Sequence, residues 1–225
     1  MHFAGSGAAR RQGARLLTRT APYASPPHAG FEHSARVEGF VRGWRRVWHQ
    51  GSTDHRGTPA FPGRTVTLVE AEGAETWGAA YRLAGDAAQQ LAALAYLEER
   101  EKQYDVRCQM PLFGWPAAGG GAAVLLLPRV LVFIGSADRS RNANYLGPAP
   151  PPAIAAQIAS AVGPSGPNSA YLYRLAAAMR AMAVGDAELF ALEAAVRSLR
   201  GSDGGDEGGG GSSGSADEGS DGEPG

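Results

Sequence analysis

The chain has 225 residues, 44% of them hydrophobic, which is enough for one domain with a buried core. Its formal net charge of −1 excludes the strongly basic balance that is typical of nucleic-acid-binding proteins. Its single cysteine, Cys108, excludes an internal disulfide and favours a reducing, cytoplasmic setting.

The two ends of the chain differ in composition from the middle. Residues 1–30 are rich in Ala, Gly, Arg and Pro without a sustained period, so we expect a disordered or loosely attached segment. Its arginines and lack of acids have transit-peptide character, which keeps organelle import as an alternative to the cytoplasm. Residues 201–225 combine seven acids with Gly and Ser and predict a disordered tail. We therefore expect one domain over residues 31–200.

Strand patterns dominate the first part of this domain. The expected strands are Val37–Val47, Arg64–Glu70, Thr76–Leu83, Asp105–Phe113 and Val124–Gly135. The aromatic residues Phe40, Trp44 and Trp48 are expected to anchor the core. Arg64–Glu70 alternates as a half-buried strand does, and Gly51–Gly63 reads as a structured loop. The apolar run Ala122–Ile134 is interrupted by Pro128 and Arg129 and is too short to span a membrane.

Helical periodicity dominates the last part, after a loop over Arg139–Pro152. The expected helices are Ala153–Val162, Ser169–Met182 with Asn168 as its cap, and Asp186–Leu199. One more helix lies among the strands and follows Asp86. This order predicts an α+β domain with a mainly antiparallel sheet or barrel.

The helix that follows Asp86 ends in a cluster of charges, YLEEREKQY. At 100° per residue, Glu101 projects between Leu94 and Leu97 on the apolar side of the helix. An acid on a buried face near the negative end of the helix dipole suits a proton acceptor. Glu98 lies on the same arc, and such a run is also typical of a solvated helix end, so periodicity does not choose between these readings.

Other chemistry-bearing residues are explained more simply as structural. His49, Asp54 and His55 match no zinc-ligand spacing and have no third or fourth ligand nearby, so a hydrogen-bonded pair is favoured over a metal site. Cys108 lies within a strand pattern, which indicates a small core residue rather than a catalytic thiol. No G-x-S-x-G motif marks a serine nucleophile.

Several stretches together carry a family resemblance. They are WHQGSTDHRGTPAFPGRTVTLVE (48–70), WGAAYRL (77–83), YLEEREKQY (96–104), NANYLGPAP (142–150) and GPSGPNSAYLYRLA (163–176). In this order they make the chain from about Phe31 to Leu199 resemble the ChaC-type γ-glutamylcyclotransferases. The resemblance implies a small mixed, mainly antiparallel β-barrel flanked by helices.

The resemblance also implies a reaction and a set of site residues. The expected reaction cyclises the γ-glutamyl group of glutathione to 5-oxoproline and releases Cys-Gly, without a metal or organic cofactor. The family's catalytic glutamate falls on Glu101, with Glu98 as the lesser candidate. Tyr104 and Tyr145 match tyrosines that bind the glutamyl group, although Glu101 and Tyr104 lie one residue closer than is usual in the family. No nucleic-acid or membrane partner is expected.

One feature of the family is not found. Its members open with a strand that ends in Y-G-S-L, whose backbone amides hold the substrate, whereas this chain has TAPYASPPHAG directly before Phe31. Loss of that strand would remove a barrel element and anion-binding donors. The alternative is therefore a catalytically weak or inactive domain of the same fold that acts as a binding module.

Overall fold

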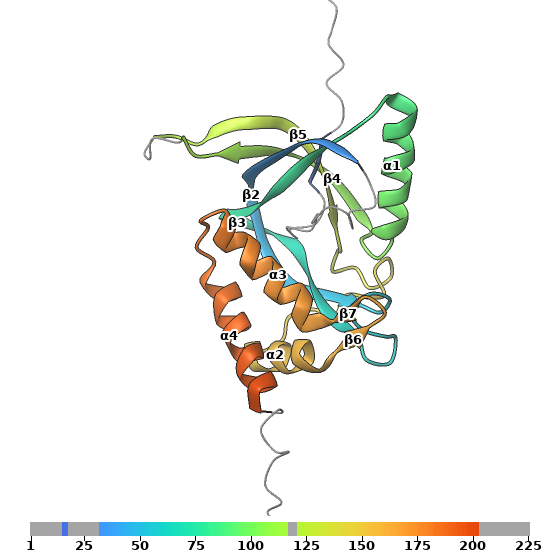
Figure 1. The fold of residues 1–225 in the computed structure, drawn as a ribbon, viewed down its shortest axis with the longest axis vertical. Helices are drawn as coiled ribbons and strands as arrows, with labels where there is room; N and C mark the ends of the chain where they lie inside the picture. Colours follow the sequence, from blue (N-terminus) through green and yellow to red (C-terminus); the bar gives the residue numbers. More distant parts are fainter. Residues whose placement is uncertain (1–14, 18–31, 117–120, 203–225) are drawn as a thin grey trace, which may run out of the picture.

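The computed structural model describes residues 15–17, 32–116 and 121–202 (Figure 1). Its elements in chain order are Arg15–Leu17 (β1), His33–Ser52 (β2), Gly63–Leu83 (β3), Ala87–Arg100 (α1), Val106–Gly114 (β4), Val124–Ile134 (β5), Pro151–Ser160 (α2), Val162–Gly163 (β6), Gly166–Pro167 (β7), Asn168–Ala181 (α3) and Ala187–Ser202 (α4). Strands followed by helices make the predicted α+β domain.

The five strands β1 to β5 form a closed barrel in the order β1-β3-β2-β4-β5. All neighbours are antiparallel except β1 and β5, which run parallel and close the ring. Helices flank the barrel, with α2, α3 and α4 on one side and α1 beside β4 and β5 (Figure 1). The prediction of a mixed, mainly antiparallel barrel flanked by helices is confirmed.

The two longest strands, β2 and β3, are longer than predicted. The expected strands Arg64–Glu70 and Thr76–Leu83 are parts of one strand, β3, which pairs with β2 along nearly its whole length. The register shifts where Gly43 of β2 and Gly73 of β3 both adopt the left-handed backbone, at φ of 78° and 73°. A glycine that interrupts a strand pattern here marks a bulge rather than the end of the strand.

Strand β3 is also buried more completely than its alternating pattern indicated. Val66 packs against α2, α3 and α4, and Leu68 packs with Val41 and Val130. Thr65 and Thr67, whose side chains point to the opposite face of the strand, are buried as well. Because helices cover the outer face of β3, both faces are sheltered from water. Phe40 is fully buried as expected, while Trp48 is half-buried against the helical layer.

Helix α1 begins as predicted but packs over a smaller area. The Asp86 side chain accepts a hydrogen bond from the backbone N–H of Gln89, and the Gln89 side chain returns one, forming a capping box. Leu97 is buried and Leu94 packs beside it, yet Leu91 is 67% exposed. Only the C-terminal half of the apolar stripe therefore contacts the barrel.

The three C-terminal helices form, with shifted starts. Helix α2 begins at Pro151, two residues before the predicted start, because proline is well tolerated in the first turn of a helix. Helix α4 runs to Ser202, and the Asp186 carboxylate accepts a hydrogen bond from the Leu189 N–H at its start. The short hairpin of β6 and β7 was not predicted.

The predicted cap role of Asn168 is wrong. Pro167 occupies the cap position of α3 and makes no side-chain capping bond. The Asn168 amide instead accepts from the Arg64 N–H at 2.7 Å and donates to the Arg64 carbonyl at 2.8 Å. It therefore replaces a neighbouring strand at the start of β3 and ties α3 to the barrel.

The terminal segments are described only in part. Arg15–Leu17 form β1 within a segment that was expected to be disordered or loosely attached, so the barrel has its opening strand although the Y-G-S-L motif is missing. Other residues of segment 1–30 lie outside the described residues, as do 203–225 of the acidic tail. In the part of the chain that the structure describes, no helix has the length and hydropathy needed to cross a membrane.

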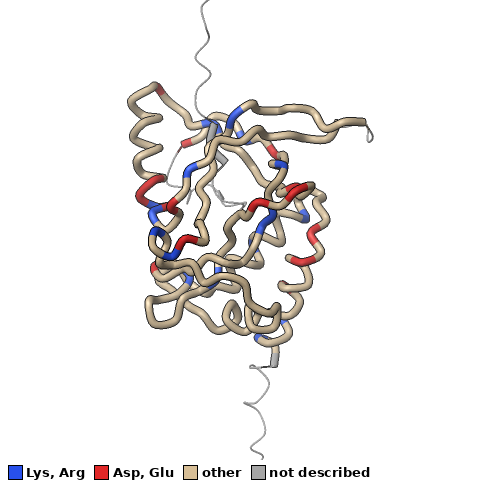
Figure 2. The backbone as a smooth tube through the Cα atoms, turned by 180° about the vertical axis from the view of Figure 1, so that it is seen from behind, with Lys and Arg blue, Asp and Glu red and all other residues tan. Residues whose placement is uncertain are grey.

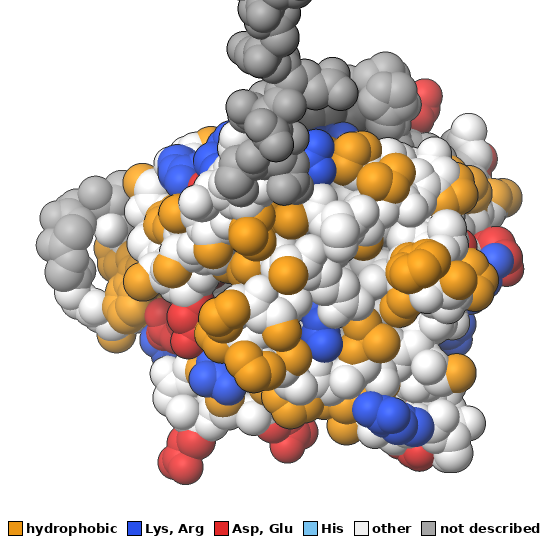
Figure 3. All heavy atoms as spheres, turned by 90° about the horizontal axis from the view of Figure 1, so that it is seen from below, with side chains coloured by type: hydrophobic (Ala, Val, Ile, Leu, Met, Phe, Trp, Pro, Cys, Tyr) orange, Lys and Arg blue, Asp and Glu red, His pale blue; other side chains and the backbone are white. Residues whose placement is uncertain are grey.

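Charges of both signs lie close together on the described backbone, most densely where α1 ends (Figure 2). There, Lys102 pairs with Glu99 at 3.0 Å. Figure 3 shows apolar side chains scattered among polar ones, with more of them gathered on the β4–β5 hairpin, where Trp115 and Leu125 are exposed. In both views, positive and negative side chains are mixed over the described surface.

Candidate active site

Glu101 lies at the C-terminal end of α1 and is 8% exposed. Its backbone N–H donates to the Leu97 carbonyl at 2.8 Å, and its own carbonyl accepts from the Tyr104 N–H at 2.8 Å. These two bonds close a tight turn, Glu101–Tyr104, that directs the chain from α1 into β4. The predicted proton acceptor is therefore sheltered from bulk water.

The structure separates Glu98 from Glu101, which periodicity could not. The Glu98 carboxylate lies 3.4 Å from the guanidinium of Arg107 on β4, and its side chain is 34% exposed. This ion pair holds the Glu98 side chain at the surface, in contact with water. Of the two candidates, Glu101 has the sheltered position.

Tyr104 is buried, and its hydroxyl is engaged by β3. That hydroxyl donates to the Val66 carbonyl at 3.0 Å and lies 3.2 Å from the Thr65 hydroxyl. The side chain also belongs to the apolar cluster of Leu97 and Phe133. Tyr104 thus fastens the Glu101 turn to the barrel wall.

Tyr145 comes from the loop between β5 and α2. Its hydroxyl lies 3.3 Å from Nδ1 of His49 on β2, and the two rings meet edge to face with centroids 5.9 Å apart. Burial lowers the pKa of His49, and the positive charges of Arg64 and Arg45 lower it further. A neutral imidazole therefore faces the phenol at neutral pH.

Two buried amides, Gln50 and Asn142, join the parts of this site. The Gln50 side chain donates to the Gln103 carbonyl within the Glu101 turn, and it also bonds to Asn142 in the loop that carries Tyr145. Sequence reasoning missed both amides, although they lie within the stretches WHQGS and NANYLGPAP. Uncharged polar residues at such positions give no signal until their partners are known.

The three residues considered as metal ligands, His49, Asp54 and His55, do not share one contact site. His49 meets Tyr145, whereas Nδ1 of His55 lies 3.2 Å from the Ser165 hydroxyl. Asp54 comes within 4.0 Å of His55. Among the residues that the structure describes, no group of three or more His, Cys, Asp or Glu is placed to hold a metal ion.

Cys108 is partly buried on β4, beside the barrel core. Burial raises the pKa of its thiol, and the nearby Glu70 raises it further. The thiol therefore stays protonated near neutral pH, which agrees with a packing role.

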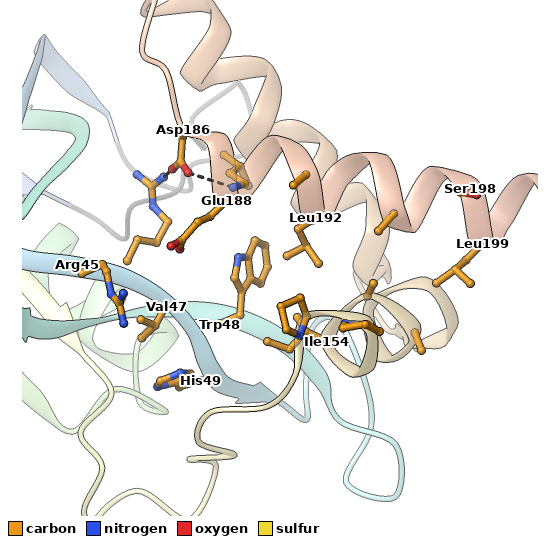
Figure 4. A pocket seen from close by; sticks show the side chains of 18 residues that line it. Arg45, Val47, Trp48, His49, Ile154, Asp186, Glu188, Leu192, Ser198 and Leu199 are labelled. Atoms are coloured by element: carbon orange, nitrogen blue, oxygen red, sulfur yellow. Dashed lines mark hydrogen bonds and ion pairs between the residues drawn. The ribbon is translucent and has the colours of Figure 1, made fainter.

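A large groove lies on another side of the barrel, between β2, α2 and α4. It encloses about 760 Å³, and Trp48 projects into it near Ile154 and Leu192 (Figure 4). Its lining includes neither Glu101 nor either site tyrosine, but it does include His49. The groove and the candidate site are therefore distinct and meet at one histidine.

Comparisons with known proteins support a common family. Residues 27–199 match the profile of the ChaC-like protein family. The chain is 44% identical to γ-glutamylcyclotransferase 2-3 of Arabidopsis thaliana over 76% of this chain and 83% of that one. It is 38% identical to glutathione-specific γ-glutamylcyclotransferase 1 of Danio rerio, over 74% and 81%. The crystal structure of a yeast γ-glutamylcyclotransferase specific to glutathione superposes with a TM-score of 0.65 at 26% identity, covering 84% and 99%.

Proposed function

Because the chain belongs to the ChaC-like protein family, we propose that it is a glutathione-specific γ-glutamylcyclotransferase. In this reaction the α-amine of the γ-glutamyl group attacks its own γ-carbonyl carbon. The bond from that carbon to the cysteine nitrogen breaks, and the products are 5-oxoproline and Cys-Gly. The names of both relatives support the reaction, and the name of the Danio rerio relative, which is glutathione-specific, supports the substrate.

Glu101 acts as the base in the proposed mechanism. Its carboxylate accepts a proton from the α-ammonium group, which frees the amine to attack, and then returns a proton to the departing nitrogen. Such a base contributes roughly 10²–10⁴-fold to a rate. The single observation that carries this assignment is the burial of Glu101, which is 8% exposed, in contrast to the more exposed side chain of Glu98.

Tyr104 and Tyr145 bind the glutamyl group in this proposal. With its hydroxyl held by β3, Tyr104 offers mainly a ring face, whereas the Tyr145 hydroxyl keeps bonding capacity beyond His49. Holding the glutamyl group in a folded conformation matters because well-oriented intramolecular reactions reach effective molarities of about 10⁵–10⁸ M.

Since nucleophile and electrophile share one molecule, the reaction needs no metal or organic cofactor. We place this activity in the cytoplasm.

The experiment is direct measurement of 5-oxoproline from glutathione by the purified full-length protein. Turnover that Glu101→Gln abolishes, and that a chelator leaves unchanged, would support the proposal. Wild-type protein that binds glutathione but releases no 5-oxoproline would replace it with the alternative of a binding module. Turnover lost on chelation would instead indicate metal-dependent chemistry.

A further inference from the structure

The candidate site is assembled from segments far apart in the chain. The Glu101–Tyr104 turn follows α1, whereas Asn142–Tyr145 lies in the loop after β5. Both segments contact the same side chain, Gln50, near the end of β2. Gln50 is fully buried.

Every polar atom of the Gln50 side chain is used. Nε2 donates to the Gln103 carbonyl at 2.9 Å and to Oδ1 of Asn142 at 3.2 Å. Oε1 accepts from Nδ2 of Asn142 at 2.8 Å. An amide with two donors, both satisfied by different segments, fixes the distance between those segments.

Asn142 connects Gln50 to the Tyr145 segment through further hydrogen bonds. Its Nδ2 also donates to the Ser136 carbonyl at 2.9 Å, and its Oδ1 accepts from the Asn144 N–H at 3.2 Å. Its carbonyl accepts from the Tyr145 N–H at 3.1 Å, and the Tyr145 backbone also forms an isolated bridge with Gln50. The position of Tyr145 thus depends on this buried amide pair.

Gly135, directly after β5, packs closely against the Gln50 amide. A Cβ atom at Gly135 would lie 2.3 Å from Oε1 of Gln50 and 2.9 Å from its Cδ. Contacts this short do not occur in proteins, so the amide fills the space that a side chain at 135 would take. The amide is held by packing as well as by hydrogen bonds.

We propose that Gln50 is a positioning residue that holds the Glu101 turn and the Tyr145 segment at a fixed position relative to each other. This inference rests on the proposed function, because it assigns Glu101 and Tyr145 to one reaction. Misplacing reacting groups by about 1 Å can cost roughly 10²-fold in rate. Loss of the amide should therefore lower kcat more than it changes KM.

The test compares Gln50→Met with Gln157→Met. Methionine is similar to glutamine in side-chain length but cannot form its hydrogen bonds. Gln157 also makes two side-chain bonds, with Arg64 and Pro62, but contacts neither the Glu101 turn nor the Tyr145 segment through them. We expect kcat for glutathione to fall about 10- to 100-fold in Gln50→Met and less than about threefold in Gln157→Met, at a temperature where both are folded.

Hydrogen–deuterium exchange provides a readout that does not depend on turnover. Amides of residues 101–104 and 142–145 should both exchange faster in Gln50→Met than in Gln157→Met. If wild-type protein produces no 5-oxoproline, the proposed function fails, and exchange alone decides whether Gln50 couples the segments.

Unchanged kcat, or faster exchange in only one segment, would overturn the positioning role. If Gln50→Met does not fold, Asn142→Asp takes its place, because it keeps the shape and removes the Nδ2 donor. The same loss of kcat and the same exchange at 101–104 are then expected, and unchanged values of both would reject the proposal.

Discussion

Glu98 and Arg107 form an ion pair, 3.4 Å apart, between α1 and the start of β4. This contact holds Glu98 at the surface, while Glu101, one turn further along, is buried against the barrel. The two acids therefore have different environments, although they share an arc of the same helix. Their comparison provides a matched pair of variants.

We predict that Glu101→Gln lowers kcat by about 10²–10⁴-fold, because glutamine keeps the shape of the side chain and cannot accept the proton. Glu98→Gln should keep at least about a third of wild-type kcat, since a partly exposed ion pair contributes little. Release of 5-oxoproline under saturating glutathione measures both. The assignment is wrong if the Glu98 variant is the inactive one.

The two site tyrosines should respond differently to loss of their hydroxyls. Tyr104→Phe leaves the Val66 carbonyl without its 3.0 Å bond, so we expect about 0.5–1.5 kcal/mol lower unfolding free energy. Tyr145→Phe should mainly raise KM, because its hydroxyl is proposed to contact substrate. Urea unfolding and glutathione saturation curves separate these effects. A stability loss in Tyr145→Phe with unchanged KM would contradict the binding role.

His49 should make stability depend on pH. Its pKa is lowered in the folded state by burial and by Arg64 and Arg45, so the unfolded chain binds the proton more readily. The resulting stabilisation is present above the unfolded pKa of about 6.5 and is lost as pH falls through the folded value. Between about pH 7.5 and 5.5, wild type should lose more unfolding free energy than His49→Asn. Equal losses would refute this.

Glu193 should contribute stability that acid removes. It is 3% exposed on α4 and bonds to Arg180 and, at 2.8 Å, to Arg197. Burial alone would raise the pKa of Glu193, but the two arginines outweigh it and lower the pKa below its usual 4.5. The stabilisation is therefore present above the unfolded pKa and lost as pH falls through the folded one.

We accordingly expect Glu193→Gln to lower unfolding free energy by about 1–3 kcal/mol at neutral pH, with a smaller further loss in acid than wild type shows. The exposed Glu188 on the same helix supplies the control, since Glu188→Gln should change little. Urea denaturation at several pH values measures both. Equal effects of the two substitutions would reject the buried ion-pair explanation.

Cys108 should react slowly with alkylating reagents. Burial and Glu70 raise the pKa of its thiol, and only the thiolate is nucleophilic. We expect iodoacetamide to modify the native protein more slowly than a free cysteine derivative at the same pH, and urea to remove the difference. Cys108→Ser should retain turnover. Rapid native alkylation with loss of activity would indicate a reactive thiol instead.

Local patterns were sufficient for elements stabilised by near neighbours. The Asp86 cap depends on Gln89, three residues away, and was predicted correctly. The prediction of two strands in place of β3 was wrong. Gly73 is typical of a strand end, and only its pairing with the region of Gly43 on β2 shows that it marks a bulge. Similarly, Asn is a preferred residue at the start of a helix, yet the Asn168 side chain bonds to Arg64, which lies 104 positions earlier.

The sequence by itself determined the strand and helix order, the family likeness, and Glu101 as one of two acids on an apolar arc, because these follow from periodicity and short-range spacing. Only the tertiary structure showed that Glu101 is buried while Glu98 lies at the surface, closed the barrel through β1 and joined the two segments through Gln50 and Asn142. The physical reason is that a buried polar group is stable only beside its partner. For Gln50 that partner lies 92 positions away.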